Sequence, residues 1–239
     1  MSRVAGGRAA GLGLLLLAGC AGDADPGSAE GGPQPPPPSV VSAYFAIAFG
    51  DRDGPAPQVL RRWKGPVHVG VRGAPSYEDR AYLRVMVPRL SALTAPVSLT
   101  LDDERPDLEL RFAPLGEIAS ASPEEAAAAT GERLSRLAVE AGERGEIESC
   151  RAAIPSGDEV PQYMRLNLIL EALVGCLGLT GTVPRPDESV FFAGPNWYEE
   201  DLAPIDLEVI RLHHAPDLAP GMRRDEVRAA LHARLRAAR

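Results

Sequence analysis

The sequence predicts an α+β fold, in which a small twisted sheet is packed by helices within a single domain. Segments with helical spacing of apolar residues are mixed with shorter segments that alternate as half-buried strands do. Their order is not that of a regularly repeated strand and helix, and no internal repeat is visible. About 200 residues follow a proline-rich stretch, which is enough for one domain with its own core.

The first half of this domain is expected to contain two helices and three strands. Pro88 falls inside the second helix and is expected to kink it, because proline removes a backbone donor and crowds the preceding turn. The segments are a helix at Val40–Phe49, a strand at Pro66–Val71, a helix at Ser76–Leu93, and strands at Val97–Leu101 and Leu108–Phe112.

The second half opens with a helix start signal. Ser122 can cap the helix, Pro123 suits its first turn, and two glutamates follow at its positive end. This helix is expected to run to about Ala141. The segments after it are a strand at Glu146–Ile154, a central helix at Pro161–Leu179, and two C-terminal helices at about Pro204–His214 and Arg223–Ala238.

Residues 1–19 have the form of a lipoprotein signal peptide. Arg3 and Arg8 precede the apolar run Leu12–Ala18, which is far shorter than the roughly 20 residues of a transmembrane helix. Leu17-Ala18-Gly19-Cys20 resembles a bacterial lipobox. The resemblance implies that Cys20 carries acyl chains such as palmitate and anchors the mature protein to a membrane without crossing it. Ala21 after it favours the outer membrane of the cell envelope, facing the periplasm.

The alternative for the N-terminus is an ordinary secreted protein in which the cysteine stands by chance. In either case residues 20–38 join the signal to the domain at 39–239. Gly22–Ser39 lacks apolar periodicity and ends in four prolines, so it cannot form a core. We expect a spacer, and the alternative is a ligand for a proline-recognition domain.

The charge balance excludes one class of partner. Removing residues 1–19 removes two arginines and no acidic residue, which leaves 23 basic and 33 acidic residues and a net charge of −10. An acidic surface repels phosphate backbones, so we expect no nucleic-acid partner.

Two cysteines remain besides Cys20. Cys150 and Cys176 are an isolated pair, and in an oxidising periplasm such a pair is a candidate disulfide. The alternative is two free buried cysteines. Two cysteines alone do not make a zinc site.

Separate segments along the domain carry a resemblance to one family. They are Tyr44–Gly50, Leu60–Val71, Arg89–Thr94, Glu188–Phe192 and Leu202–Val227. Together they resemble the bacterial domain of unknown function 2927, whose members are mostly secreted or lipid-anchored. The resemblance implies a zincin-like fold, that of zinc-dependent peptidases, with the central helix at about 161–179 in the place of their metal-binding helix.

In such peptidases the helix carries His-Glu-x-x-His, because histidines four residues apart grip one zinc while the glutamate activates water. Alignment on the Leu-Gly-Leu that ends the helix places Glu171 at the first histidine, Ala172 at the glutamate and Gly175 at the second histidine. Alanine cannot accept a proton and glycine has no ligand atom. We therefore expect no metal, no cofactor and no confident catalytic residue, with Glu171 as the one candidate.

Other ligand types do not rebuild a site in the sequence. His213 and His214 are adjacent, so on a helix they point about 100° apart, and we interpret them as helix-end cations near the last carbonyls. The acidic turn at 102–104 could bind calcium, but it lacks the alternating spacing of calcium loops, and a solvated turn is the simpler interpretation.

The polar residues of the central helix form one stripe. Tyr163, Asn167, Glu171 and Gly175 follow at intervals of four, on a helix that is otherwise apolar. One interpretation is a remnant cleft with Glu171 at its floor; the other is a buried helix with one side in solvent. In the first case the aromatic loop 184–201 can border the cleft and contact a peptide or glycan; in the second its aromatic residues only pin the loop. Those residues are Phe191, Phe192, Trp197 and Tyr198.

These observations favour a lipid-anchored envelope protein that acts as a non-catalytic binding or scaffold module, with an envelope protein, peptide or glycan as partner. The alternative is an enzyme: a peptidase-like hydrolase with a noncanonical site around Glu171, or a metal site assembled from distant residues.

Overall fold

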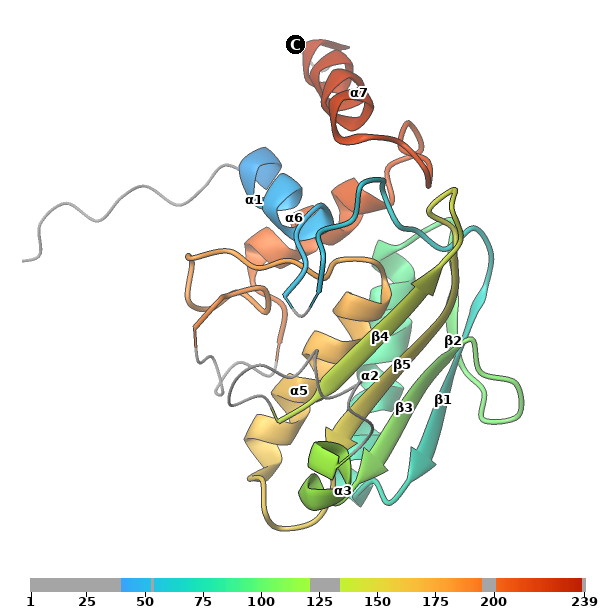
Figure 1. The fold of residues 1–239 in the computed structure, drawn as a ribbon, viewed down its shortest axis with the longest axis vertical. Helices are drawn as coiled ribbons and strands as arrows, with labels where there is room; N and C mark the ends of the chain where they lie inside the picture. The colour runs from blue at the N-terminus through green and yellow to red at the C-terminus, as the bar shows by residue number, and fades with distance from the viewer. Residues whose placement is uncertain (1–39, 53, 121–133, 195–200, 238–239) are drawn as a thin grey trace, which may run out of the picture. The chain divides into compact units, whose positions relative to one another are not determined.

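A five-stranded sheet with helices packed against one face forms the body of the protein (Figure 1). The computed structural model describes residues 40–52, 54–120, 134–194 and 201–237. The strands are β1 (Val67–Gly73), β2 (Leu99–Leu101), β3 (Leu108–Ala113), β4 (Arg136–Ala141) and β5 (Ile147–Pro155). The helices, labelled as in Figure 1, are α1 (Val40–Ala48), α2 (Tyr77–Leu93), α3 (Leu115–Ser120), α5 (Gln162–Cys176), α6 (Pro204–His213) and α7 (Arg224–Ala237).

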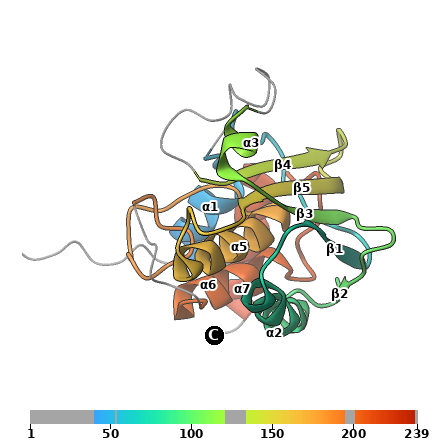
Figure 2. The same cartoon turned by 90° about the horizontal axis from the view of Figure 1, so that it is seen from below.

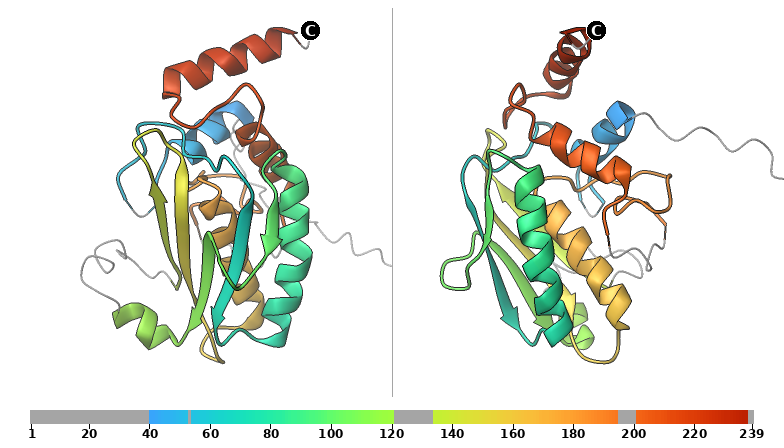
Figure 3. Two further views of the ribbon diagram at one scale, coloured as in Figure 1. Left: turned by 90° about the vertical axis from the view of Figure 1, so that its right-hand side faces the viewer. Right: turned by 180° about the vertical axis from the view of Figure 1, so that it is seen from behind.

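The strand order is β2-β1-β3-β5-β4, and the sheet is mixed. Strands β2, β1, β3 and β5 are parallel to one another, and β4 runs antiparallel to β5 at one edge. Helices α2 and α5 pack side by side against the same face (Figures 2 and 3). The predicted fold class, a small sheet packed by helices, is confirmed.

Alternation along the strands explains why only one face is covered. Every second residue of β1 and β3, and of β5 from Cys150 to Ile154, is apolar and buried beneath the helices, because successive strand residues point to opposite faces. The residues between them include His68, Arg72, Glu109 and Arg151, which reach solvent on the other face. Parallel sheets usually have both faces covered. The polar residues on the outer face of this sheet make a second helical layer unnecessary.

Strand β4 corrects one prediction. The expected helix from Ser122 to about Ala141 is wrong over residues 136–141, which pair with β5 as a strand. Its predicted start, Ser122 to Glu125, lies outside the described residues. Leu137, Val139 and Ala141 alternate with more polar residues, and the hydrogen bonds to β5 favour this period of two over the helical pattern. Helix α3 was not expected.

The remaining predicted helices and strands are confirmed, with ends that differ by a few residues. Pro88 lies inside α2 and does not end it, and the kink stays a prediction. None of the helices in the described part of the chain is both long and apolar enough to span a bilayer.

The predicted disulfide is confirmed. Cys150 of β5 is bonded to Cys176, the last residue of α5, with 5.6 Å between the Cα atoms. The bond closes a loop over a sequence separation of 26, and it holds the end of α5 against the sheet. Restricting the unfolded chain over a loop of this length stabilises the fold by about 3 kcal/mol.

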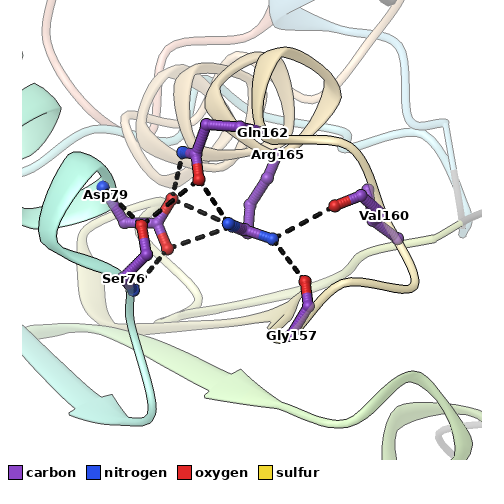
Figure 4. Close-up of polar contacts among 6 residues, drawn as sticks. All are labelled: Ser76, Asp79, Gly157, Val160, Gln162 and Arg165. Carbon is purple, nitrogen blue, oxygen red and sulfur yellow. Dashed lines mark hydrogen bonds and ion pairs between the residues drawn. The ribbon is translucent and has the colours of Figure 1, made fainter.

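A buried polar network joins the first turns of α2 and α5 (Figure 4). Asp79 is fully buried, caps α2 together with Ser76, and accepts hydrogen bonds of 3.0 Å from Arg165 Nε at both carboxylate oxygens. Gln162 Nε2 donates to the same carboxylate over 2.7 Å, and Arg165 Nη1 donates to the carbonyl of Gly157 over 2.8 Å. Both buried charges are therefore paired and hydrogen-bonded.

Candidate functional site

A cavity of about 540 Å³ lies between helix α5 and the edge strand β4. Two loops complete its wall: the segment that follows α1, through residues 51, 52 and 54, and the segment at 190–194. The residues that line it include Arg52, Arg136, Leu137, Glu171, Gly175 and Phe191.

An ion pair forms the polar side of this cavity. Arg52 Nη1 donates to Glu171 Oε2 over 2.7 Å, and the two side chains are about one-fifth exposed. A second pair, Arg61 with Asp51, lies 3.5 Å apart in the same lining. The cavity therefore offers both a carboxylate and guanidinium groups, and these can contact a ligand that carries either sign of charge.

Strand β4 packs against α5 at Gly175. A Cβ atom added to Gly175 would lie 2.5 Å from Cδ2 of Leu137, which is shorter than any ordinary contact. Leu137 thus occupies the space beside Gly175. A larger side chain at 175 would have to displace the end of Leu137.

A buried carboxylate on α6 accepts hydrogen bonds from the loop that carries Phe191. Asp206 is fully buried and accepts hydrogen bonds from Ser189 Oγ at 2.5 Å and from the amides of Val190 and Ala203. Burial raises the pKa of Asp206, although these three hydrogen bonds favour its charged form. The backbone of Phe191 also accepts a hydrogen bond from Val183. The cavity wall is therefore fixed at this loop.

The structure brings together part of the predicted cleft. Glu171, Gly175 and Phe191 line the cavity, and Phe192 lies beside them. Tyr163 is 37 % exposed on the first turns of α5 and does not line the cavity, while Asn167 is fully buried. Trp197 and Tyr198 lie outside the described residues.

Sequence reasoning missed Arg52 and Arg136. Arg52 follows the end of α1 in a polar loop and belongs to no motif, so only the fold brings it to Glu171, 119 residues away. Arg136 was assigned to a helix, and its place in the cavity wall depends on the strand that forms instead. An arginine just after a helix-ending glycine is a weak signal that could have marked the first of them.

The interpretation of His213 and His214 as helix-end cations is wrong. Both are buried, at 0 % and 2 % exposure. Burial, then His214 and Arg62, lowers the pKa of His213 well below its ordinary value, and burial and Arg62 lower the pKa of His214 to about 3. Both rings are therefore neutral at neutral pH.

His213 joins three elements instead. Its Nε2 lies 3.0 Å from the carbonyl of Leu177, which can only accept, so Nε2 carries the proton. Its Nδ1 then accepts from the hydroxyl of Tyr44 over 3.3 Å. The ring links α6 to α1 and to the end of α5, which is a structural role.

Metal ligands do not gather in the part of the chain that the structure describes: no three His, Cys, Asp or Glu side chains there form a group that could hold an ion. His68 lies 2.8 Å from Asp107 at the solvent face of the sheet, as an isolated pair.

Strand β4 gives the cavity a further property. Among the strands of the described residues it is the last in the sheet order, so one row of its backbone amides and carbonyls faces away from the other strands. An extended chain can add to such an edge through backbone hydrogen bonds while its side chains enter neighbouring pockets.

Comparison with protein-family models finds one family that matches residues 38–233, described as protein of unknown function (DUF2927). This span contains the whole cavity lining and all but the end of α7. Comparison with curated proteins finds no match.

Proposed function

The chain belongs to the DUF2927 family, and we propose that it is a lipid-anchored binding module of the bacterial cell envelope, without catalytic activity of its own. We place the anchor at Cys20 and the protein at the outer membrane, facing the periplasm. The ligand in this proposal is an extended polypeptide segment that lies along β4 in the cavity.

The observation that carries the proposal is the position of the cavity. It lies between the edge strand β4 and the polar positions of α5, so a chain that pairs with β4 passes the Glu171–Arg52 ion pair. Backbone pairing supplies affinity that does not depend on sequence, and the charged pair supplies selectivity among side chains or a terminal carboxylate.

The chemistry of α5 supports binding over catalysis. In the proposed zincin-like arrangement α5 takes the place of the metal-binding helix, but Ala172 has no proton acceptor and Gly175 no ligand atom. Leu137 occupies the space beside Gly175, and the carboxylate of Glu171 is engaged by Arg52. These features favour a site that holds a chain over one that cleaves it.

The alternative is a hydrolase with a noncanonical site around Glu171. One observation favours it, because the Glu171 carboxylate lines the cavity and could act on a bound chain. Metal analysis of the purified full-length protein separates the two: stoichiometric zinc that is lost in Glu171→Ala, together with cleavage of peptides, would sink the binding proposal.

The direct test measures peptide binding. Full-length protein in mild detergent is screened against short unstructured peptides, and binding of the best peptide is followed by fluorescence anisotropy. Arg52→Ala should weaken binding about tenfold or more, because it removes charge-assisted hydrogen bonds in the cavity. Arg72→Ala, the same change on the opposite face of the sheet, is the control and should leave binding unchanged. Equal effects of both variants would contradict the proposed site.

A further inference from the structure

Charge is distributed unevenly between the C-terminal helix and the rest of the chain. Residues 223–239 contain six arginines and two acidic residues, a net charge of +4. The preceding residues keep 19 of the 25 basic and 31 of the 33 acidic residues, a net charge of −12. Helix α7 is thus a basic segment on an acidic protein.

Helix α7 holds two of its arginines against the aromatic rings of α1. The guanidinium carbon of Arg224 lies 5.5 Å from the ring centre of Phe45 and 6.0 Å from that of Phe49, and that of Arg228 lies 5.2 Å from Phe45. Buried Val227 on the same helix fixes this arrangement. Figure 3 shows α1 and α7 at the same end of the domain. These four residues, Phe45, Phe49, Arg224 and Arg228, are called the α1–α7 surface below.

The two arginines of this surface keep their charge available. Within the described ranges neither Arg224 nor Arg228 forms an ion pair, whereas Arg223 and Arg234 on the same helix do. Helix α1 contains no charged residue, so no acidic side chain of α1 itself offsets them. A cation held over an aromatic ring stays solvated on its outer side and can still meet an anion.

The chain places this surface near the proposed anchor. Helix α1 begins at Val40, 20 residues after Cys20. A chain of that length spans about 25 Å when flexible and at most about 70 Å when extended. A domain tethered so close to a bilayer collides with it repeatedly. The face of the domain that anionic lipid does not repel should stay in contact with the bilayer longest.

From these observations we infer that the α1–α7 surface docks on anionic phospholipid headgroups of the membrane to which the chain is tethered. The inference rests on the proposed lipid anchor for proximity, and on the arginines for contact. The acidic remainder of the chain is repelled from the same headgroups, so docking orients the domain with α1 and α7 toward the bilayer. Each arginine near such a surface contributes about a factor of five to the equilibrium.

The test uses full-length protein bound to vesicles of phosphatidylcholine, with or without about a third phosphatidylglycerol, each doped with a lipid whose headgroup carries a photo-crosslinker. Cross-links to the peptide that contains α7 are counted per protein molecule. They should be abundant with the anionic lipid, rare without it, and lost in molar salt, which shortens the screening length to about 3 Å.

Variants identify the surface. Arg224→Gln with Arg228→Gln should shift the contact equilibrium by roughly thirtyfold and remove most cross-links. Arg72→Gln with Arg111→Gln removes the same charge from the outer face of the sheet and should change nothing. Arg224→Lys with Arg228→Lys keeps the charge and should keep the cross-links. This lysine pair also covers the case in which the glutamine pair does not fold.

Three outcomes would overturn the inference: equal cross-linking on neutral and anionic vesicles, equal loss in the glutamine pair and its control, or loss in the lysine pair. Failure of the anchor is a separate result. An unacylated chain stays in solution with neutral vesicles, yet it still reaches anionic vesicles through α7, so its cross-links still test the docking.

Discussion

Two arginine–carboxylate pairs on helix α5 have opposite surroundings. Arg165 in its first turn binds Asp79 inside the protein, with every contact shown in Figure 4 made by protein groups. Glu171, six residues later, binds Arg52 at the wall of a cavity, where both side chains keep about one-fifth of their surface in solvent. The first pair holds two helices together, and the second leaves charge where a ligand can reach it. One helix thus provides both a buried structural contact and a charged group at a cavity.

The largest expected effect comes from breaking the buried pair. Arg165→Met leaves the fully buried Asp79 without its cation and should lower the free energy of unfolding by about 3–5 kcal/mol. Urea unfolding followed by circular dichroism measures it. Adding Asp79→Leu should recover part of the loss, since no charge then stays buried. If the free energy of unfolding of Arg165→Met alone lies within about 1 kcal/mol of the parent, the buried pair contributes no more than a surface pair.

The second largest effect is expected from acid, which should lower the free energy of unfolding by protonating His214 in the unfolded chain. The pKa of His214 is about 3 in the folded protein against 6.5 in the unfolded chain, so between these values only the unfolded state binds the proton. Stability conferred by the neutral ring is present above pH 6.5 and is lost as the pH falls, with a loss of about 4 kcal/mol by pH 3.

The contribution of His214 is isolated by His214→Phe. Within the described residues neither ring nitrogen of His214 has a hydrogen-bond partner, so an apolar ring should fit without leaving a new polar group unpaired. Unfolding at a series of pH values should give a flatter profile for this variant than for the parent below pH 6.5. Parallel profiles would refute the assignment.

The disulfide between Cys150 and Cys176, at the C-terminal end of α5, should contribute slightly less to stability. Replacing Cys150 and Cys176 by serine should cost about 3 kcal/mol, because the unfolded chain regains the freedom of the closed loop. Urea midpoints of the parent, with and without reductant, give the same comparison. Two free thiols in denatured, unreduced periplasmic protein would show that the bond does not form there.

The smallest effect is expected at the cavity. Glu171→Gln keeps the shape of the side chain and removes one charge of a partly exposed pair, so stability should change by less than about 1 kcal/mol. The same variant should change peptide binding measurably, since the charge faces the cavity. A large loss of stability without a change in binding would reverse the contrast between the two pairs.

Local patterns in the sequence were sufficient for most of the fold. The alternation in β1 and β5 and the apolar spacing of α5 predicted these elements, because burial of one face dictates each pattern. The disulfide followed from two isolated cysteines in a chain that the sequence predicts to be exported. Strand β4 was missed because an alanine-rich segment suits a helix, and only pairing with β5 selects the strand.

The candidate site was less predictable, since it depends on contacts between distant segments. The spacing of Glu171 and Gly175 on one helix face left two interpretations open, a cleft or a buried helix with one side in solvent, and both residues line the cavity. The same spacing gave no indication that Asn167 is fully buried, because burial of α5 depends on what packs against it. Arg52 reaches Glu171 only through the turn after α1, which no periodicity encodes.

The contact between Leu137 and Gly175 bears on which side chains position 175 can accept. A Cβ atom there would lie 2.5 Å from Cδ2 of Leu137, so any larger residue requires the end of that side chain to move aside. Because Leu137 also lines the cavity from β4, such a movement would change the cavity wall as well. We therefore expect substitutions at 175 and changes in the shape of the cavity to occur together.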